Sequence, residues 1–231
     1  MKIKLILFAL FLTSTAIAQE KKQSFFSKFE IAANYGPAGN FFVDYGRDLK
    51  IDDGTIEPMY SEISDEFQLY QKNFIGSSGG VDITFNFNEK NALALSFDRS
   101  LNYGKYNGAP ILDNGTPVIV NDIKLRHLNH FYNLTYRRSL DKKNSFYISA
   151  GITYVRMNQA EIEIGLSENI VVIEERNYDN SFLEEGGFVL GLEKYFYSSG
   201  KFELGLKSKA FILTTTGLEA ITLTPVLRFN F

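Results

Sequence analysis

The two histidines, His127 and His130, are the side chains of this sequence best suited to acid–base chemistry or metal binding near neutral pH. Successive side chains of an extended strand point to opposite faces, so a spacing of three positions puts the two imidazoles on opposite sides. We expect His127 to point inward and His130 outward, and the pair therefore cannot bind one metal ion from one face. A histidine–acid hydrolase would also need acidic partners on neighbouring strands. We predict no catalytic residues, no metal site and no cofactor.

Charged side chains are the second group that could do chemistry. They fall on the polar face of segments that alternate with period two, and their chemistry depends on what that face meets. If the face is enclosed, the charges must pair with one another or be costly to bury. We therefore predict a salt-bridged network that fills the interior, with a gated path for small ions as the alternative. The network comprises Glu30, Asp82, Asp98, Arg137, Glu193, Glu203, Lys207, Lys209 and Arg228.

The elements that must position these groups are strands, because apolar and polar residues alternate in segment after segment. In the clearest example, Val81, Ile83 and Phe85 are separated by Asp82 and Thr84. Eight segments follow this rule. We predict that they are strands and that they pair with one another around an enclosed interior. They are residues 29–36, 81–87, 93–98, 128–137, 146–154, 187–193, 202–207 and 221–231.

The connections between these segments alternate between short and long. Residues 88–91, 141–144 and 198–200 have the composition of hairpin turns, whereas 47–73, 105–122 and 161–181 are long, with a fourth connection at 214–217. The alternation places the short turns and both termini on one rim, and four hairpins give eight strands. Turn signals at 52–54 and 113–115 predict β-ribbons that project from two long loops, and a ribbon drawn into the wall would give ten strands.

The N-terminus has the three parts of a secretory signal peptide. Lys2 and Lys4 precede an unbroken apolar run at 5–12, and Ala16 and Ala18 stand before Gln19. The run is too short to span a membrane as a helix. We predict a cleaved signal over residues 1–18, a periplasmic N-terminal segment over 19–27 and a barrel over 28–231. Because the chain has no cysteine, it offers neither a lipidation site nor a disulfide.

The residues of the polar face favour a membrane barrel over a soluble β-sandwich. The chain is 45% hydrophobic and 22% charged, which would suit either fold. The polar face, however, consists mainly of Gly, Ala, Ser, Thr and Asn, as in the tight interior of a small barrel. Aromatic residues cluster beside the short turns, as in the girdles of membrane barrels. We predict a closed antiparallel transmembrane barrel, with a soluble periplasmic sandwich as the rival fold.

The last strand, residues 224–231, carries the most specific resemblance. It ends in alternating Phe229 and Phe231 after a polar Thr224, with Val226 where a glycine is usual. In this pattern the chain resembles the outer-membrane barrels of the OmpA and OmpX type, and in particular the barrel-domain proteins of Bacteroidetes, including the PorT-like group. The resemblance implies an outer-membrane location with periplasmic termini. It also implies that the barrel assembly machinery reads Thr224, Phe229 and Phe231.

The long loops carry an excess of negative charge. Residues 47–73 hold seven acidic and three basic side chains, and residues 161–185 hold eight acidic side chains and one basic. An acidic external face would attract divalent cations, which could bridge it to lipopolysaccharide phosphates, and it disfavours nucleic acid. Solvation of the loops is the alternative interpretation.

These features lead to one functional hypothesis and two alternatives. We expect a monomeric, non-enzymatic outer-membrane barrel with a structural, surface-interaction or envelope-integrity role, in contact with membrane lipid. The alternatives are a narrow channel for ions or small solutes and an outer-membrane enzyme that hydrolyses lipid or peptide. A lipid hydrolase would present His and Ser together on a late strand, and residues 221–231 contain neither.

Overall fold

The structure, a computed structural model, describes residues 25–41, 49–52, 71–72, 75–105, 117–121, 126–158, 160–167, 170–175 and 182–231. Residues 1–24, with the predicted signal peptide and its cleavage residues Ala16, Ala18 and Gln19, lie outside these ranges. A single turn of 3₁₀ helix, η1 (Phe25–Lys28), leads into the first strand. No described helix is long and apolar enough to cross a membrane.

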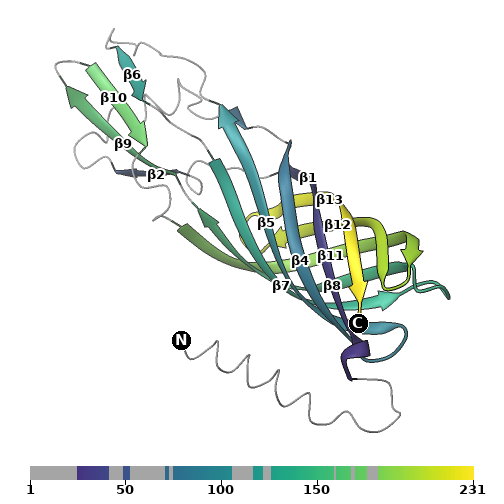
Figure 1. Cartoon of the computed structure of the whole chain (residues 1–231). Helices are drawn as coiled ribbons and strands as arrows, with labels where there is room; N and C mark the ends of the chain where they lie inside the picture. The colour runs from purple at the N-terminus through teal and green to yellow at the C-terminus, as the bar shows by residue number, and fades with distance from the viewer. Residues whose placement is uncertain are drawn as a thin grey trace, which may run out of the picture.

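Eight antiparallel strands form a closed barrel (Figure 1). Around the wall, each strand pairs with the next, and the last pairs with the first. The order is β1 (Phe29–Asn40), β4 (Ile75–Asn86), β5 (Asn91–Lys105), β7 (Arg126–Ser139), β8 (Phe146–Asn158), β11 (Phe182–Ser199), β12 (Phe202–Leu213) and β13 (Gly217–Asn230). The eight predicted strands are confirmed, and both the ten-stranded wall and the soluble sandwich are wrong.

The short turns at 87–90, 140–145 and 200–201 define one end of the barrel, here called the short-turn rim. The Asn88 side-chain oxygen accepts hydrogen bonds from the backbone N–H groups of Lys90 and Asn91, each at 3.0 Å. Asp141 likewise accepts from the N–H of Ser145 at 2.8 Å. Gly200 adopts a φ of 60°, a conformation that glycine takes without steric cost. Both ends of the described chain lie at this rim, since Glu30 pairs with Asn230.

A second, four-stranded sheet lies beyond the opposite end of the barrel, the loop rim (Figure 1). It consists of β2 (Leu49–Asp52), β6 (Val118–Asn121), β9 (Ala160–Ser167) and β10 (Ile170–Glu175). Three different loops contribute to it: β2 and β6 each come from a loop of their own, and β9 and β10 share the third. Strand β2 runs parallel to β9, and β6 runs parallel to β10. Only β9 and β10 form a hairpin within one loop. A two-residue strand, β3 (Gln71–Lys72), pairs separately with the end of β5.

This external sheet, as we call these four strands, corrects the prediction of two independent ribbons. The strands next to the turn signals pair with the third long loop, which supplies β9 and β10, rather than folding back on their own. Residues 53–54 and 113–115, where the predicted turns would lie, are outside the described residues.

The ladder between β1 and β13 is interrupted along the seam that closes the barrel. Pairing stops after Asn34 opposite Val226 and resumes at Ala38 opposite Thr222, without a change of register. The unpaired stretch contains Pro37 on one strand and Pro225 on the other. A proline has no backbone N–H to offer a ladder, which accounts for a break at these positions.

The strands bury one face inside the barrel and expose the other, as period-two alternation requires. On β4 and β5, for example, Ile83 and Leu95 are 51% and 61% exposed, whereas Asp82 is 3% exposed. The exposed face is apolar on every strand of the wall. Such an exposed apolar surface is the reverse of a soluble protein and matches a lipid environment.

Candidate functional site

The inward charged residues form one continuous chain of ion pairs, here called the charge ladder. Acidic and basic side chains alternate along it, and every basic group touches two acidic ones. In order, the ladder joins Asp98, Lys209, Asp82, Lys207, Glu193, Arg137, Glu30, Arg228 and Glu203. The structure therefore brings together all nine inward charges named from the sequence.

The inner half of the ladder is held by short contacts to two lysines. Lys209 Nζ lies 2.5 Å from Asp98 Oδ2 and 3.1 Å from Asp82 Oδ1. Lys207 Nζ lies 2.5 Å from Asp82 Oδ2 and 2.9 Å from Glu193 Oε1. The two lysines and the carboxylates of these three acids are all no more than 5% exposed. Charge-assisted hydrogen bonds of this kind offset part of the cost of removing charges from water.

The outer half of the ladder leads to the short-turn rim through two arginines. Arg137 contacts Glu30 and lies 3.5 Å from Glu193 Oε2. Arg228 contacts Glu203 and lies 3.4 Å from Glu30 Oε2. Exposure rises to 18% at Glu203, where the ladder meets a polar cavity of about 480 Å³ at this rim.

Aromatic rings enclose the arginines of the ladder. The guanidinium of Arg228 lies 3.8 Å from the ring centre of Tyr195, and that of Arg137 lies 4.5 Å from the ring of Tyr147. The Tyr195 hydroxyl donates a hydrogen bond to Glu193 at 3.1 Å. Arginine stacks on aromatic faces while its fork of donors binds carboxylates. The rings thus exclude water from around the ion pairs.

One glycine makes room for the inner end of the ladder. A Cβ on Gly80 would lie 2.3 Å from Asp98 Oδ1 and 2.7 Å from the carbonyl oxygen of Phe97. The Asp98 carboxylate thus lies over the bare backbone of β4, where it also accepts a hydrogen bond from Asn133 at 2.8 Å. No larger residue fits at position 80 without a shift of its neighbours.

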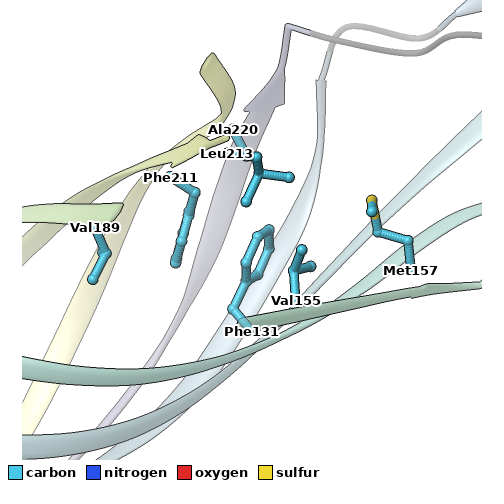
Figure 2. Close-up of a cluster of buried hydrophobic side chains, with 7 residues drawn as sticks. All are labelled: Phe131, Val155, Met157, Val189, Phe211, Leu213 and Ala220. Carbon is cyan, nitrogen blue, oxygen red and sulfur yellow. The ribbon is translucent and has the colours of Figure 1, made fainter. Parts of the chain in front are cut away.

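Above the ladder, toward the loop rim, an apolar cluster fills the lumen (Figure 2). The rings of Phe131 and Phe211 stack face to face with centroids 3.9 Å apart. They come from β7 and β12, which are separated in the wall by β8 and β11, so the stack spans the interior. The remaining members of this apolar plug are Val155, Met157, Val189, Leu213 and Ala220. The ladder and the plug together occupy successive levels of the lumen.

A histidine–acid pair lies beyond the plug, nearer the loop rim. Its histidine is on β7, four residues before Phe131. His127 Nε2 is 2.9 Å from Glu219 Oε1, and the Asn129 side chain donates a hydrogen bond to the same oxygen at 2.7 Å. All three residues are fully buried. His130 lies on the outer face, as expected from the spacing. The described residues contain no group of three His, Cys, Asp or Glu side chains suited to a metal ion.

Sequence reasoning missed Glu219. On a regular strand it would share the outward face of Ile221 and Leu223. A β-bulge shifts the register here, so that Phe211 of β12 lies opposite Ala220 and the next residue, Ile212, lies opposite Leu218. Both Glu219 and Ala220 are consequently buried. Bulges re-aim side chains in this way. The one sequence signal was an acidic residue that interrupts the apolar positions of the last strand.

The residues of the terminal strand occupy both faces of the wall. Thr224 is buried, and its hydroxyl lies 3.4 Å from Asn34 Oδ1. The rings of Phe229 and Phe231 meet edge to face at the short-turn rim, with centroids 5.1 Å apart. Val226 fills the lumen against Tyr147 and Tyr195, which gives this position a packing role that glycine would not supply.

No protein-family profile matches the chain, and no curated protein sequence matches it. Among solved structures, the chain is similar to Neisserial surface protein A, with 12% identity, a TM-score of 0.50 and coverage of 88% of this chain and 97% of that one. The fold is that of a small outer-membrane barrel. The attachment invasion locus protein Ail of Yersinia pestis covers 87% of this chain and 99% of its own at a TM-score of 0.40 and 8% identity. The N-terminal barrel of Pseudomonas aeruginosa OprF gives a TM-score of 0.41 and 8% identity, with 87% and 98% coverage.

Proposed function

We propose that this protein is a non-enzymatic barrel of the bacterial outer membrane that holds the external sheet on the cell surface for interaction or for envelope integrity. The observation that carries the proposal is that three separate loops join into one ordered sheet beyond a barrel whose interior is filled. Loops that only connect strands of the barrel would not need to pair with one another as parallel strands. The barrel acts as the anchor and the external sheet as the working surface.

The outer surface of the wall supports membrane insertion. Side chains such as Ile83, Leu95, Ile152 and Leu190 are about half exposed around the whole circumference. An insertion through strands needs a closed barrel, because an open sheet edge leaves backbone groups unpaired in lipid. In this proposal the short-turn rim and both termini face the periplasm, residues 1–18 direct export, and assembly machinery reads Thr224, Phe229 and Phe231.

The filled lumen supports a structural role over a channel. An ion crossing the lumen would have to separate the pairs at Lys207 and Lys209 and then pass the stacked rings of Phe131 and Phe211. Breaking a buried ion pair costs about 3–5 kcal/mol, and the aromatic stack offers no polar group in return. We infer that the barrel is closed to solutes.

The register of the external sheet supports a role for divalent cations. Asp52 pairs with Glu163, Glu163 with Glu174, and Glu174 with Asn121, so three acidic positions and an amide form one row across four strands. The loops that supply these strands are also strongly acidic in sequence. In this proposal calcium or magnesium ions bind the acidic loops and link them to lipopolysaccharide phosphates.

The experiment compares three strains of the native host: one with the full-length protein, one with residues 159–176 replaced by a short Gly-Ser turn, and one without the protein. Heat-modifiable migration from the outer-membrane fraction establishes that the first two make a folded barrel. We expect the turn-replacement strain to lose surface attachment or resistance to detergent as fully as the null strain. If it behaves like the full-length strain, the external sheet is not the working surface.

A second candidate function, an envelope hydrolase, is favoured by one observation, the His127–Glu219 pair. Both residues are fully buried, and general base catalysis requires contact with a substrate proton. Two assays separate the structural barrel, the channel and the hydrolase: conductance in planar bilayers, and hydrolysis of ester or peptide substrates. Hydrolysis that disappears in a folded His127→Gln variant would replace the proposal with an enzyme, and steady conductance would replace it with a channel.

A further inference from the structure

Three basic residues lie side by side on the outer face of the wall, near the loop rim. The register places Arg99 of β5 opposite His130 of β7, and His130 opposite Arg156 of β8. Arg99 and Arg156 are exposed and His130 is partly exposed. We call these residues the basic row. In the described part of the chain neither arginine forms an ion pair, so their charge is available to a ligand.

An aromatic row lies directly below the basic row, toward the middle of the wall. Phe97, Tyr132 and Tyr154 occupy the same three strands, with ring centroids 5.2 and 6.0 Å apart. The ring of Phe97 stacks on His130 at 6.0 Å. Aromatic side chains of this kind mark the boundary between the hydrocarbon and the headgroups of a bilayer. The basic row is therefore at headgroup height.

An apolar groove of about 490 Å³ descends from the aromatic row along the same strands. Its apolar walls come from β4, β5, β7 and β8, namely Val81, Ile83, Leu95, Phe97, Tyr132, Leu134, Ile152 and Tyr154. The groove is open to the side, as an acyl chain lying against the wall would require. The basic row and the apolar groove thus lie one after the other along the barrel axis.

One acidic residue adjoins the basic row. Glu184 of β11 lies opposite Arg156 in register, and its single negative charge is smaller than the combined positive charge of the two arginines. The guanidinium of Arg156 packs over the ring of Phe182 at 3.6 Å. The described row is therefore positive overall even with His130 neutral, and Arg156 is held in place by Phe182.

We propose that the basic row and this groove form a binding site for a phosphorylated glycolipid of the outer leaflet, with a phosphate on Arg99 and Arg156 and an acyl chain in the groove. The inference rests on the proposed outer-membrane location. Arginine binds phosphate through paired, charge-assisted hydrogen bonds that are about twice as strong as neutral ones. Position decides the leaflet, because the site lies at the loop rim rather than at the short-turn rim.

The test measures lipid binding by the purified full-length barrel in neutral detergent, by native mass spectrometry and by the midpoint of heat modification. The probes are diphosphorylated lipid A, the same lipid A without phosphates, and inorganic pyrophosphate. The variants are R99Q/R156Q, which removes the charges, and I152W, which fills the groove. R138Q is the matched control, since Arg138 is an exposed arginine on the same wall near the short-turn rim.

We expect the wild type to bind lipid A at least tenfold more tightly than the dephosphorylated lipid, and R99Q/R156Q to lose that difference, a change of about 1.4 kcal/mol. I152W should weaken the binding of both lipids, and R138Q should bind them like the wild type. Pyrophosphate should not displace lipid A. Equal binding of the two lipids, an equal loss in R138Q, or displacement by pyrophosphate would each overturn the site. Failure of the proposed function would be visible beforehand, as a protein without heat-modifiable migration.

Discussion

Replacing Lys207 with methionine should destabilise the barrel more than any other single change in the charge ladder. Lys207 Nζ lies 2.5 Å from Asp82 and 2.9 Å from Glu193, and its side chain is 5% exposed. Methionine has nearly the same shape, so the substitution removes the charge with little change in packing. The five acids of the ladder would then face three bases instead of four, and both acids lose their closest cation.

Each acid keeps one partner, which limits the damage. Asp82 retains Lys209 at 3.1 Å and Glu193 retains Arg137 at 3.5 Å. Removing one partner of a buried pair costs about 3–5 kcal/mol, and we expect Lys207→Met to lower the free energy of unfolding by about 3 kcal/mol. The double variant Asp82→Asn/Lys207→Met removes one charge of each sign. It should be more stable than Lys207→Met alone by at least about 1 kcal/mol.

The assay is urea unfolding of the protein refolded into lipid vesicles, with the folded fraction read from heat-modifiable migration. Lys194→Met is the matched control, because Lys194 is 53% exposed and lies 3.7 Å from Asp141. An exposed pair of this kind contributes about 0–1 kcal/mol. If Lys207→Met costs no more than Lys194→Met, or if the double variant is no more stable than the single, the ladder is not a coupled network of buried charges.

Three further changes test other parts of the fold. Truncating both rings of the plug in Phe131→Ala/Phe211→Ala should cost at least about 3 kcal/mol and raise ion leakage in planar bilayers, whereas an unchanged baseline would show that the ladder alone seals the lumen. Gly80→Ala should cost about 1–3 kcal/mol in urea unfolding, because its Cβ would meet Asp98 Oδ1 at 2.3 Å, and wild-type stability would mean that the carboxylate moves freely. Hydrogen bonds from Ser145 hold the pKa of Asp141 below its usual range, so Asp141→Ala should lower the midpoint of heat modification at neutral pH. That difference should shrink as the pH falls below about 4, because the carboxylate of the unfolded chain then gains a proton that the folded protein binds only at lower pH. A pH-independent difference would show that the charge is not involved.

Period-two alternation was enough to predict the wall of this protein. An inward residue on a strand stays inward whatever the neighbouring strands do, so the faces of Asp82, Arg137 and Lys207 followed from the sequence. Which of these charges touch depends on the stagger between strands, and alternation carries no information about stagger. The ladder order, in which Lys207 bridges β4 and β11 across the lumen, therefore required the structure.

Two parts of the molecule escaped prediction for different physical reasons. Glu219 turns inward because a bulge inserts one residue, and a single extra residue reverses the faces of the residues before it relative to those after it. Two of the loops that supply the external sheet were predicted to form separate ribbons, and no strand was predicted in the third, although Ile162, Ile164 and Leu166 alternate with acidic and small residues in β9. The parallel pairings of this sheet join loops that are far apart in the sequence, and no local signal specifies such partners.

The interrupted seam between β1 and β13 has a consequence for how the wall comes apart and comes together. A barrel in hydrocarbon is sealed by its hydrogen bonds, and the strip from Tyr35 to Pro37 opposite 223–225 lacks paired residues at mid-height. Because two of these positions are prolines, the gap leaves fewer bare N–H donors facing lipid than any other break of that length would. The ladder of backbone hydrogen bonds is thus incomplete along the line where the first and last strands meet. Thermal breathing should begin there, and amide exchange at Tyr35 and Leu223 should precede exchange elsewhere in the strands.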